Sequence, residues 1–392
     1  MRVLFYLAYR TLVRSRVSFV LLLAAVTAGL GFQIPNTANI EGYTAELREK
    51  GLSRDTGHVR VTAKSGGTFE GAEALAARIT QEPFVRAATI RLVHVGSFFH
   101  GERTTSASIA GIDPVAEDRA AGFCQELAEG RCMAAGDERP AVLGAKLAEQ
   151  LDAHVGSSIK VALPFSAGDD VRMVSAVFRV VGVLRGSGGF RADYELFVPL
   201  DALRDLFGKH RVSSEIRVFS TDDARAGEWA KRIAELAPDQ KVETWWEAQT
   251  FVKNAIDGNR ALSAISTTMV VVAVMIPVLA LLYIHVLHER RRIATIAALG
   301  FSRREIFLIH LFEALLVGGI GTVLGSGLGY ALCRYFQDNP IFSHQGFVVL
   351  PSITLRSFLI PALVLFATTL LAGIVPAILA SRAEPAVELR RE

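Results

Sequence analysis

The sequence has few cysteines and lacks the short motifs that mark common catalytic and nucleotide-binding sites. Three of its 392 residues are cysteine, and no Cys/His spacing typical of a zinc site occurs. No HExxH, GxSxG or Walker-type GxxxxGK[ST] motif is present, and the nine histidines are scattered without ligand spacing. We therefore expect neither catalysis nor a bound metal or cofactor in this chain.

The chain also lacks a large charge excess and a long basic tract. Its formal net charge is +3 at pH 7, so nucleic acid is not an indicated partner. Hydrophobic residues are abundant instead. They make up 51% of the sequence, and the mean hydropathy of +0.34 is high for a soluble protein.

Four mostly apolar runs are each long enough to cross a hydrocarbon core, which takes about 20 helical residues. The predicted spans are 17–40, 262–287, 306–333 and 358–380, and the third contains an uncharged run from residue 314. We expect an α-helical membrane protein with four transmembrane helices in a lipid bilayer, plus a large α+β extracytoplasmic domain between the first two.

The arginines predict how these spans are oriented. Residues 1–16 carry four arginines and no acid, and five more arginines lie at 290–292 and 303–304. Because cytoplasmic loops carry an excess of Lys and Arg, both segments should be cytoplasmic. The predicted segments are a cytoplasmic interfacial helix over 1–16, a cytoplasmic helix over 288–301, a short outer loop over 334–357 and a cytoplasmic tail over 381–392. A cleaved signal peptide is the alternative for the N-terminus, but the long basic region at helical spacing favours a retained anchor.

The outer segment, 41–246, mixes strand and helix patterns and could form two lobes. The predicted strands are 58–64, 106–112, 158–165, 177–184 and 215–220, and the predicted helices are 71–80, 141–151, 199–208 and 224–236. Cys124 and Cys132 fall in this segment. Their spacing permits a disulfide in an oxidising compartment but does not demand one.

Residues 247–261 are predicted to form a stalk helix continuous with the second span, as the only long connection between that span and the outer domain. Phe251 and Asn259 lie on this stalk, and Trp246 lies where it meets the domain. The tryptophan pair at 245–246 could sit at the membrane interface or cap the core of the outer domain.

Glycines recur every four residues in the third span, at Gly321, Gly325 and Gly329. Small residues at this spacing let two helices approach closely in lipid, although glycine is also common in membrane helices generally. His310 and Glu313 lie one turn apart near the start of the same span. They could belong to a proton pathway, or Glu313 could pair with Arg303, Arg304 or a partner chain while His310 is interfacial.

The stretch "ERRRIATIAALGFSRREIF" holds a short basic helix between two spans. Gly300 should end this helix with a left-handed cap, and Ser302 should begin the next one. Such a helix is suited to docking into a cleft of another protein, whereas a loop that only sets topology would not need capping. The predicted contact residues are Glu289, Arg290, Arg291, Arg292, Ile293, Ile296, Leu299 and Gly300.

This stretch, continued to "LIHLFEALLVGGIGTVLGSGLGY", resembles the signature of the FtsX-like (MacB/LolC/LolE-type) permease family of ABC transporters. "LAYRTLVRSR", "GHVRV", "AGIDP", "AVLGAKLAEQL" and "PAILASRAEPAVELR" resemble the family as well. The resemblance spans essentially the whole chain and is nearest to the lipoprotein-releasing members.

The resemblance implies a multi-pass protein of the bacterial inner membrane with a large MacB-like domain in the periplasm. It implies that residues 289–300 contact a separate cytoplasmic ABC ATPase dimer, which would bind ATP and Mg, and that two permease chains pair as a homodimer or heterodimer. ATP-driven movement would reach the periplasmic domain by mechanotransmission and release or export lipoprotein or other hydrophobic cargo, with a periplasmic adaptor or carrier as a further partner. The alternative is a signalling module that regulates a periplasmic partner such as a cell-wall hydrolase.

Overall fold

The computed structural model describes residues 1–167, 170–187, 190–222, 225–344 and 347–382. The chain divides into two compact units. The helical unit comprises Met1–Thr44, Asp257–Ile341 and the described residues from Val349, and the core domain comprises the described residues of Ala45–Ile256 and Phe342–Val348. Most of the predicted cytoplasmic tail, 383–392, lies outside the described residues.

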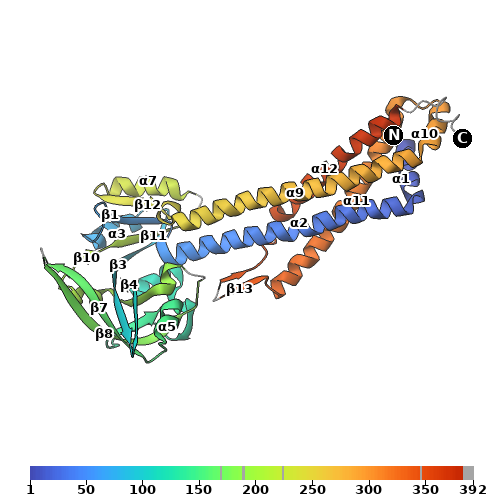
Figure 1. Ribbon diagram of the computed structural model, residues 1–392. Coiled ribbons are helices and arrows are strands. Elements are labelled where there is room, and N and C mark those ends of the chain that lie inside the picture. Colours follow the sequence, from blue (N-terminus) through green and yellow to red (C-terminus); the bar gives the residue numbers. More distant parts are fainter. Residues whose placement is uncertain (168–169, 188–189, 223–224, 345–346, 383–392) are drawn as a thin grey trace. The chain divides into compact units, whose positions relative to one another are not determined.

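The helical unit is built from six helices, drawn as coiled ribbons in Figure 1. They are α1 Arg2–Arg14, α2 Arg16–Lys50, α9 Thr250–His288, α10 Arg290–Ala298, α11 Arg303–Asp338 and α12 Leu355–Ser381. Four of them, α2, α9, α11 and α12, are long and apolar enough to cross a membrane. Each contains one of the predicted spans, so the prediction of four long apolar helices is confirmed.

Both helices that lead toward the core domain differ from the prediction. The helix α2 continues well past residue 40 to Lys50 and runs directly into a π-helical turn, η1 Gly51–Thr56, because helix-forming residues fill its polar end. The stalk at 247–261 is therefore not the only long connection. It also does not start at 247, because Gln249 leaves the helical conformation and separates α8 Trp245–Ala248 from α9.

Polar side chains join α2 to α9 inside the helical unit. Gln33 Nε2 donates to Thr267 Oγ1 over 2.7 Å, and Asn36 Nδ2 donates to Ser266 Oγ over 2.8 Å. Inter-helix hydrogen bonds of this kind contribute about 0.6 kcal/mol each in a membrane protein. These bonds favour the pairing of the two helices and also fix which faces meet.

The core domain is an α+β structure organised on one mixed sheet of ten strands. The path of nine strands runs β12-β1-β11-β3-β4-β9-β6-β8-β5, and β7 pairs with β3 and β8. The strands of this sheet are β1 Val59–Ala63, β3 Val85–His100, β4 Arg103–Ile112, β5 Leu127–Gly130, β6 Pro140–Leu143, β7 Ser158–Ala167, β8 Asp170–Leu184, β9 Glu195–Pro199, β11 Glu215–Ser220 and β12 Gln240–Thr244. Two small two-stranded sheets pair β2 Phe69–Glu70 with β10 Val212–Ser213, and β13 Phe342–His344 with β14 Phe347–Val349.

Helices and short helical turns pack on this sheet and connect its strands. They are α3 Ala72–Thr80, α4 Pro114–Ala121, η2 Phe123–Glu126, α5 Ala145–Leu151, η3 Arg191–Tyr194, α6 Leu200–Leu206 and α7 Ala226–Leu236. One hydrophobic cluster lies under α3 and α7 against β1 and β11, and a larger one lies under α5 and α6 against β7 and β8. The long strand β3 contributes residues to both clusters, so two cores share one sheet.

The predicted strands are all present, but one predicted helix is wrong in part. Residues 141–151 were expected to be helical, whereas Pro140–Leu143 form the buried strand β6 and only Ala145–Leu151 form a helix. The apolar triplet at 141–143 lies between β8 and β9 in the sheet. A short apolar run of this kind cannot be assigned from periodicity alone.

Candidate functional site

The most unusual feature of the core domain is a buried cluster of arginines and carboxylates. Its centre is Glu117 on α4, which is 1% exposed. Arg91 on β3 donates two hydrogen bonds to this carboxylate, from Nε over 2.9 Å and from Nη2 over 3.1 Å, and Arg217 Nη2 on β11 donates a third. The planar guanidinium of Arg91 matches both carboxylate oxygens, which is the strong bidentate form of this contact.

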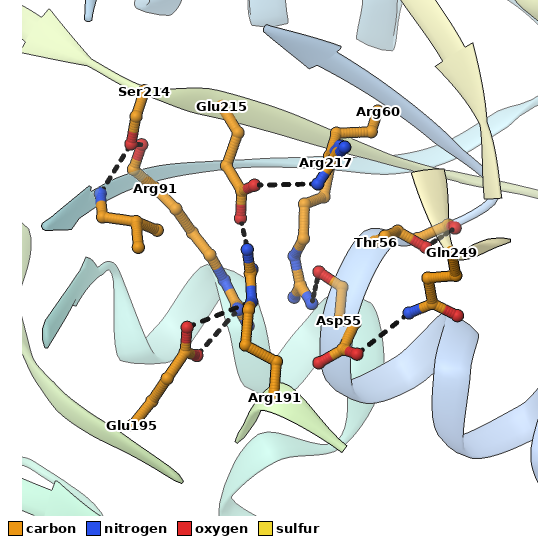
Figure 2. Close-up of polar contacts among 12 residues, drawn as sticks. Asp55, Thr56, Arg60, Arg91, Arg191, Glu195, Ser214, Glu215, Arg217 and Gln249 are labelled. Atoms are coloured by element: carbon orange, nitrogen blue, oxygen red, sulfur yellow. Dashed lines mark hydrogen bonds and ion pairs between the residues drawn. The ribbon is translucent and has the colours of Figure 1, made fainter. Parts of the chain in front are cut away.

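A second group extends the cluster along the sheet, and Figure 2 shows how its side chains converge. Arg191 donates to Glu215 Oε1 over 2.9 Å, and its Nε lies 3.1 Å from Glu195 Oε1. Arg91 Nη1 lies 3.9 Å from Glu195 Oε2 and links the two groups. Three arginines therefore face three glutamates, which balances the buried charge.

Electrostatics keep the central groups of this cluster charged. Burial alone would raise the pKa of Glu117, but Arg217 and Arg91 outweigh it and lower that pKa to about 2. Burial and the neighbouring Arg91 lower the pKa of Arg217 to about 10, which still leaves it protonated at neutral pH. The cluster is thus a set of paired ions in a low-dielectric interior, where removal of one partner is costly.

The end of α2 is tied to this cluster. Arg217 Nη1 donates to the main-chain oxygens of Ser53 and Asp55 over 3.3 and 3.4 Å, within the η1 turn that follows α2. Arg54 of the same turn donates to Glu126 Oε2 over 2.6 Å, and Lys50 Nζ lies 3.7 Å from the same oxygen. Through these contacts, the end of α2 and the turn that follows it bind charged side chains of the core domain.

Gln249 connects the start of α9 to the same turn. Its Nε2 donates to the Gly51 main-chain oxygen over 3.2 Å and to Asp55 Oδ2 over 3.0 Å, as Figure 2 shows in part. Gln249 is 9% exposed. A single buried amide thus joins the residues at which both connecting helices, α2 and α9, meet the core domain.

Sequence reasoning missed this cluster. Glu215 and Arg217 were recognised only as part of a strand, in which alternate charged residues normally face solvent. In the structure all six residues of β11 are buried, so its charged members need partners. Those partners lie on other elements, so the sequence pattern alone does not identify them.

The predicted docking residues lie on α10 and at its ends. Gly300 has φ +97°, and the side chain of Ser302 caps α11 by accepting from the Glu305 main-chain nitrogen, as predicted. Ile293 is 3% exposed and packs on Val286 of α9, Ile306 of α11 and Ala380 of α12 within the same chain.

The outward face of α10 differs from the predicted apolar side. Ile293 points into its own chain, whereas Leu299 is 75% exposed. Arg291, Thr295 and Ala298 are exposed as well, and this spacing places them with Leu299 on the side away from Ile293. Ile296 is half-buried beside the Ile293 cluster. The remaining predicted residues, Glu289, Arg290 and Arg292, lie at the α9–α10 turn, where Arg292 Nη1 is 3.4 Å from Glu289 Oε2.

The three predicted glycines form a close contact between α11 and α2 within one chain. A Cβ added to each of Gly321, Gly325 and Gly329 would lie 2.8 Å from a side-chain carbon of Val26, Leu30 and Ile34, respectively. Real Cβ atoms do not approach so closely, so only glycine permits this helix spacing. The predicted close helix contact is therefore one between α11 and α2 of the same chain, and enlarging these glycines should affect the fold of the chain itself.

The other predicted residues occupy less constrained positions. Trp246 lies on α8 rather than on the stalk and packs edge-to-face with buried Trp245, which fits a cap on the domain core. Phe251 is 82% exposed near the start of α9, and Asn259 lies about two turns further along that helix. Cys124 and Cys132 form a disulfide, and Cys333 is a buried free thiol on α11.

Among the described residues, Glu313 faces histidines rather than Arg303 or Arg304. His310 and Glu313 are both buried, and His310 Nδ1 lies 2.8 Å from Glu313 Oε2. A third residue, His285 at the end of α9, faces the same carboxylate. Sequence reasoning did not include this histidine, which is 25 positions from His310 along the chain.

Four helices long and apolar enough to cross a membrane, together with a separate α+β unit, are typical of a membrane protein with an extramembrane domain. Two family models match the chain in these same two parts. The MacB-like periplasmic core domain matches residues 18–236, which is more than half of the chain, and the FtsX-like permease C-terminal domain matches residues 263–385. The chain belongs to the FtsX-like permeases with a MacB-like periplasmic core domain, and is an ABC transporter permease of the MacB/LolC type.

Three relatives are similar to this chain over part of their length. The lipoprotein-releasing system transmembrane protein LolC of Haemophilus influenzae is 24% identical over 262 residues, which are 64% of this chain and 64% of LolC. An uncharacterized ABC transporter permease of Methanocaldococcus jannaschii is 22% identical over 68% of this chain and 66% of that protein. The macrolide export ATP-binding/permease protein MacB of Brucella abortus is 30% identical over 57% of this chain and 35% of that protein. The chain thus covers less than two thirds of each relative.

Proposed function

We propose that this chain is the permease subunit of a bacterial inner-membrane ABC transporter that works by mechanotransmission. A separate cytoplasmic ATPase dimer binds ATP and Mg and hydrolyses ATP, and two permease chains pair above it. The permease converts the resulting movement of its helices into movement of the core domain in the periplasm. This assignment extends the family membership to a mechanism and to partners.

The observation that carries the proposal is that the two connecting helices, α2 and α9, are joined to each other at the ends that lie in the core domain. Each of α2 and α9 contributes residues to the helical unit and to the core domain without a flexible linker. Gln249 and the η1 turn join their ends, and the ionic cluster holds that turn. Force applied along a helix reaches a packed interior through such contacts, whereas a flexible chain would absorb it.

The proposed ATPase contact is the outward face of α10. Arg291, Thr295, Ala298 and Leu299 form an exposed strip on a capped helix between two apolar helices. Packing of Ile293 against α9, α11 and α12 attaches the strip to three membrane helices. Movement imposed on α10 would therefore be passed to all three.

The proposed cargo is lipoprotein or another hydrophobic molecule, handled outside the membrane or at its outer leaflet. The lipoprotein-releasing name of one relative supports the first part of this statement. The second part rests on how few charged residues interrupt the four long apolar helices. A periplasmic adaptor or carrier would then receive the cargo. Mass spectrometry of lipids and proteins that co-purify with the complex identifies the cargo directly.

Replacing Leu299 with Asp should weaken ATPase docking without harming the fold. The side chain is 75% exposed in the isolated chain, so the free permease tolerates the charge, whereas a packed contact would bury it unpaired. We expect the amount of co-purifying ATPase to fall about tenfold, as a loss of about 1.4 kcal/mol requires. Quantitative mass spectrometry of the affinity-purified permease measures the ratio.

Leu355→Asp is the matched control, because Leu355 is an exposed leucine at the start of α12 and should leave the ratio unchanged. Ile296→Asp is less informative, since Ile296 packs beside the buried Ile293 cluster. Undiminished ATPase in the Leu299→Asp preparation would remove α10 as the docking site.

A further inference from the structure

The helical unit contains one buried carboxylate that faces two histidines from different segments. Glu313 on α11 is 1% exposed, His310 on the same helix is 6% exposed, and His285 on α9 is 2% exposed. Glu313 Oε2 lies 2.8 Å from His310 Nδ1 and 3.8 Å from His285 Nε2. The contact between Glu313 and His310 is a hydrogen bond, whereas Glu313 and His285 are too far apart for one.

The surroundings of these three residues are apolar. Leu282 of α9, Ala314 of α11 and Gly373 of α12 pack together next to them. From α1, Leu4 and Ala8 pack on Ile309, while the arginines and tyrosines of α1 are exposed. No buried residue described on α12 is titratable.

Glu289 and Arg292, which pair with each other at the α9–α10 turn, also act on His285. An ionised carboxylate in such a place requires a compensating charge, because isolated buried ions are very costly. An imidazolium beside the carboxylate is the compensating charge that this cluster can supply. Within the described part of the chain, neither His285 Nε2 nor Glu313 Oε1 has a hydrogen-bond partner. The arrangement has room for one further interaction, which a small approach of α9 to α11 would complete.

This cluster lies close along the chain to both ends of α10. His285 precedes the end of α9 by three residues, and His310 lies two turns into α11. Arg290–Ala298, which is α10, forms the connection between these two points. A change in the distance between His285 and Glu313 would therefore act close to the two helix ends that hold α10.

We propose that Glu313, His310 and His285 form a proton-operated latch, in which a proton taken up by His285 from cytoplasmic water draws its Nε2–H onto Glu313 and closes α9 against α11. The closed latch holds α10 firmly between the two helices, and loss of the proton releases it. His285 and Glu313 act as positioning residues. The relevance of the latch to transport rests on the proposed docking of an ATPase at α10, but the latch itself does not.

Hydrogen exchange of the full chain in lipid nanodiscs tests the latch without the ATPase. After correction for the intrinsic effect of pH, amides of residues 290–299 should exchange about tenfold more slowly at pH 6 than at pH 8, which corresponds to about 1.4 kcal/mol in favour of the closed form. Protonation of His285 increases as the pH falls, so protection should be greatest at pH 6 and be lost as the pH rises.

Two variants and one control separate the latch from a purely structural contact. His285→Gln and Glu313→Gln should each abolish the pH dependence, and His288→Gln should retain it, because His288 is an exposed histidine in the last turn of α9. If Glu313→Gln fails to fold, His285→Gln alone decides whether the pH dependence comes from the latch. Equal corrected exchange at both pH values in the parent, or an unchanged pH dependence in His285→Gln, would overturn the proposal.

A parallel measurement distinguishes failure of the latch from failure of the proposed function. ATPase co-purification at pH 6 and pH 8 reports on docking, whereas exchange reports on the latch. A pH-dependent exchange with no bound ATPase in any sample would support the latch and contradict the docking assignment.

Discussion

Replacing Glu117 with Ala should destabilise the core domain by about 3–5 kcal/mol, the usual result of removing one partner from a buried ion pair. The reason is that Arg91 and Arg217 would both remain buried and charged without their shared acceptor. A domain is typically stable by about 5–15 kcal/mol, so this variant should be close to unfolding. Denaturant titration of the full-length protein in detergent, followed by hydrogen exchange of β3 and β11 peptides, measures the loss.

Two further variants identify the cause of that loss. Glu102→Ala removes a carboxylate from an exposed turn and should change stability by less than about 0.5 kcal/mol. Simultaneous replacement of Arg91, Glu117 and Arg217 by apolar residues of similar volume should recover only part of the stability, because it removes the uncompensated arginines but leaves Arg191 to face both Glu195 and Glu215. A Glu117→Ala protein as stable as the parent would mean that the cluster is not a set of compensating ions.

Replacing Gly325 with Leu should separate α11 from α2 and destabilise the helical unit by about 3 kcal/mol, at the upper end of overpacking effects. A Cβ at this position would lie 2.8 Å from Leu30 Cβ and 3.2 Å from the Thr27 main-chain oxygen. The backbone oxygen cannot move aside as a flexible side chain can. The thermal unfolding temperature of the purified chain in detergent measures the effect.

Gly327→Leu is the matched control on the same helix, because nothing lies within 4 Å of a Cβ added at Gly327. It should melt at or slightly above the parent temperature, since leucine has the higher helix propensity. Equal melting of the Gly325 and Gly327 variants would show that the glycines are incidental to helix packing.

The long apolar helices could be predicted because a bilayer imposes a minimum length of apolar residues that few other structures share. The helix cap at Ser302 and the left-handed Gly300 followed from local chemistry. The extension of α2 to Lys50 did not, because its polar end lacks an apolar stripe that would mark a helix. Residues 141–143 were misassigned because a three-residue apolar run has no clear period.

The buried polar sites were less predictable because their partners are distant in sequence. Arg217 meets Glu117 across 100 positions and Asp55 across 162. A single sequence gives no indication of such pairs. His310 and Glu313 could be noticed as neighbours on one helix turn, but His285 joins them only through the packing of α9 near α11.

The most direct test of the account is to make both connecting helices flexible at once. About seven Gly/Ser residues, equal to two helical turns, would be inserted after Thr44 in α2 and after Asn259 in α9. A helix-forming Ala/Glu/Lys insertion of equal length at the same sites is the control. ATP hydrolysis by the isolated complex and export by cells that depend on it would be measured together. We predict that the protein with Gly/Ser insertions still binds its ATPase and hydrolyses ATP but loses export. The control with helix-forming insertions should retain more of the export activity. Full export with flexible insertions in both helices would contradict mechanical transmission and favour a substrate channel through the membrane.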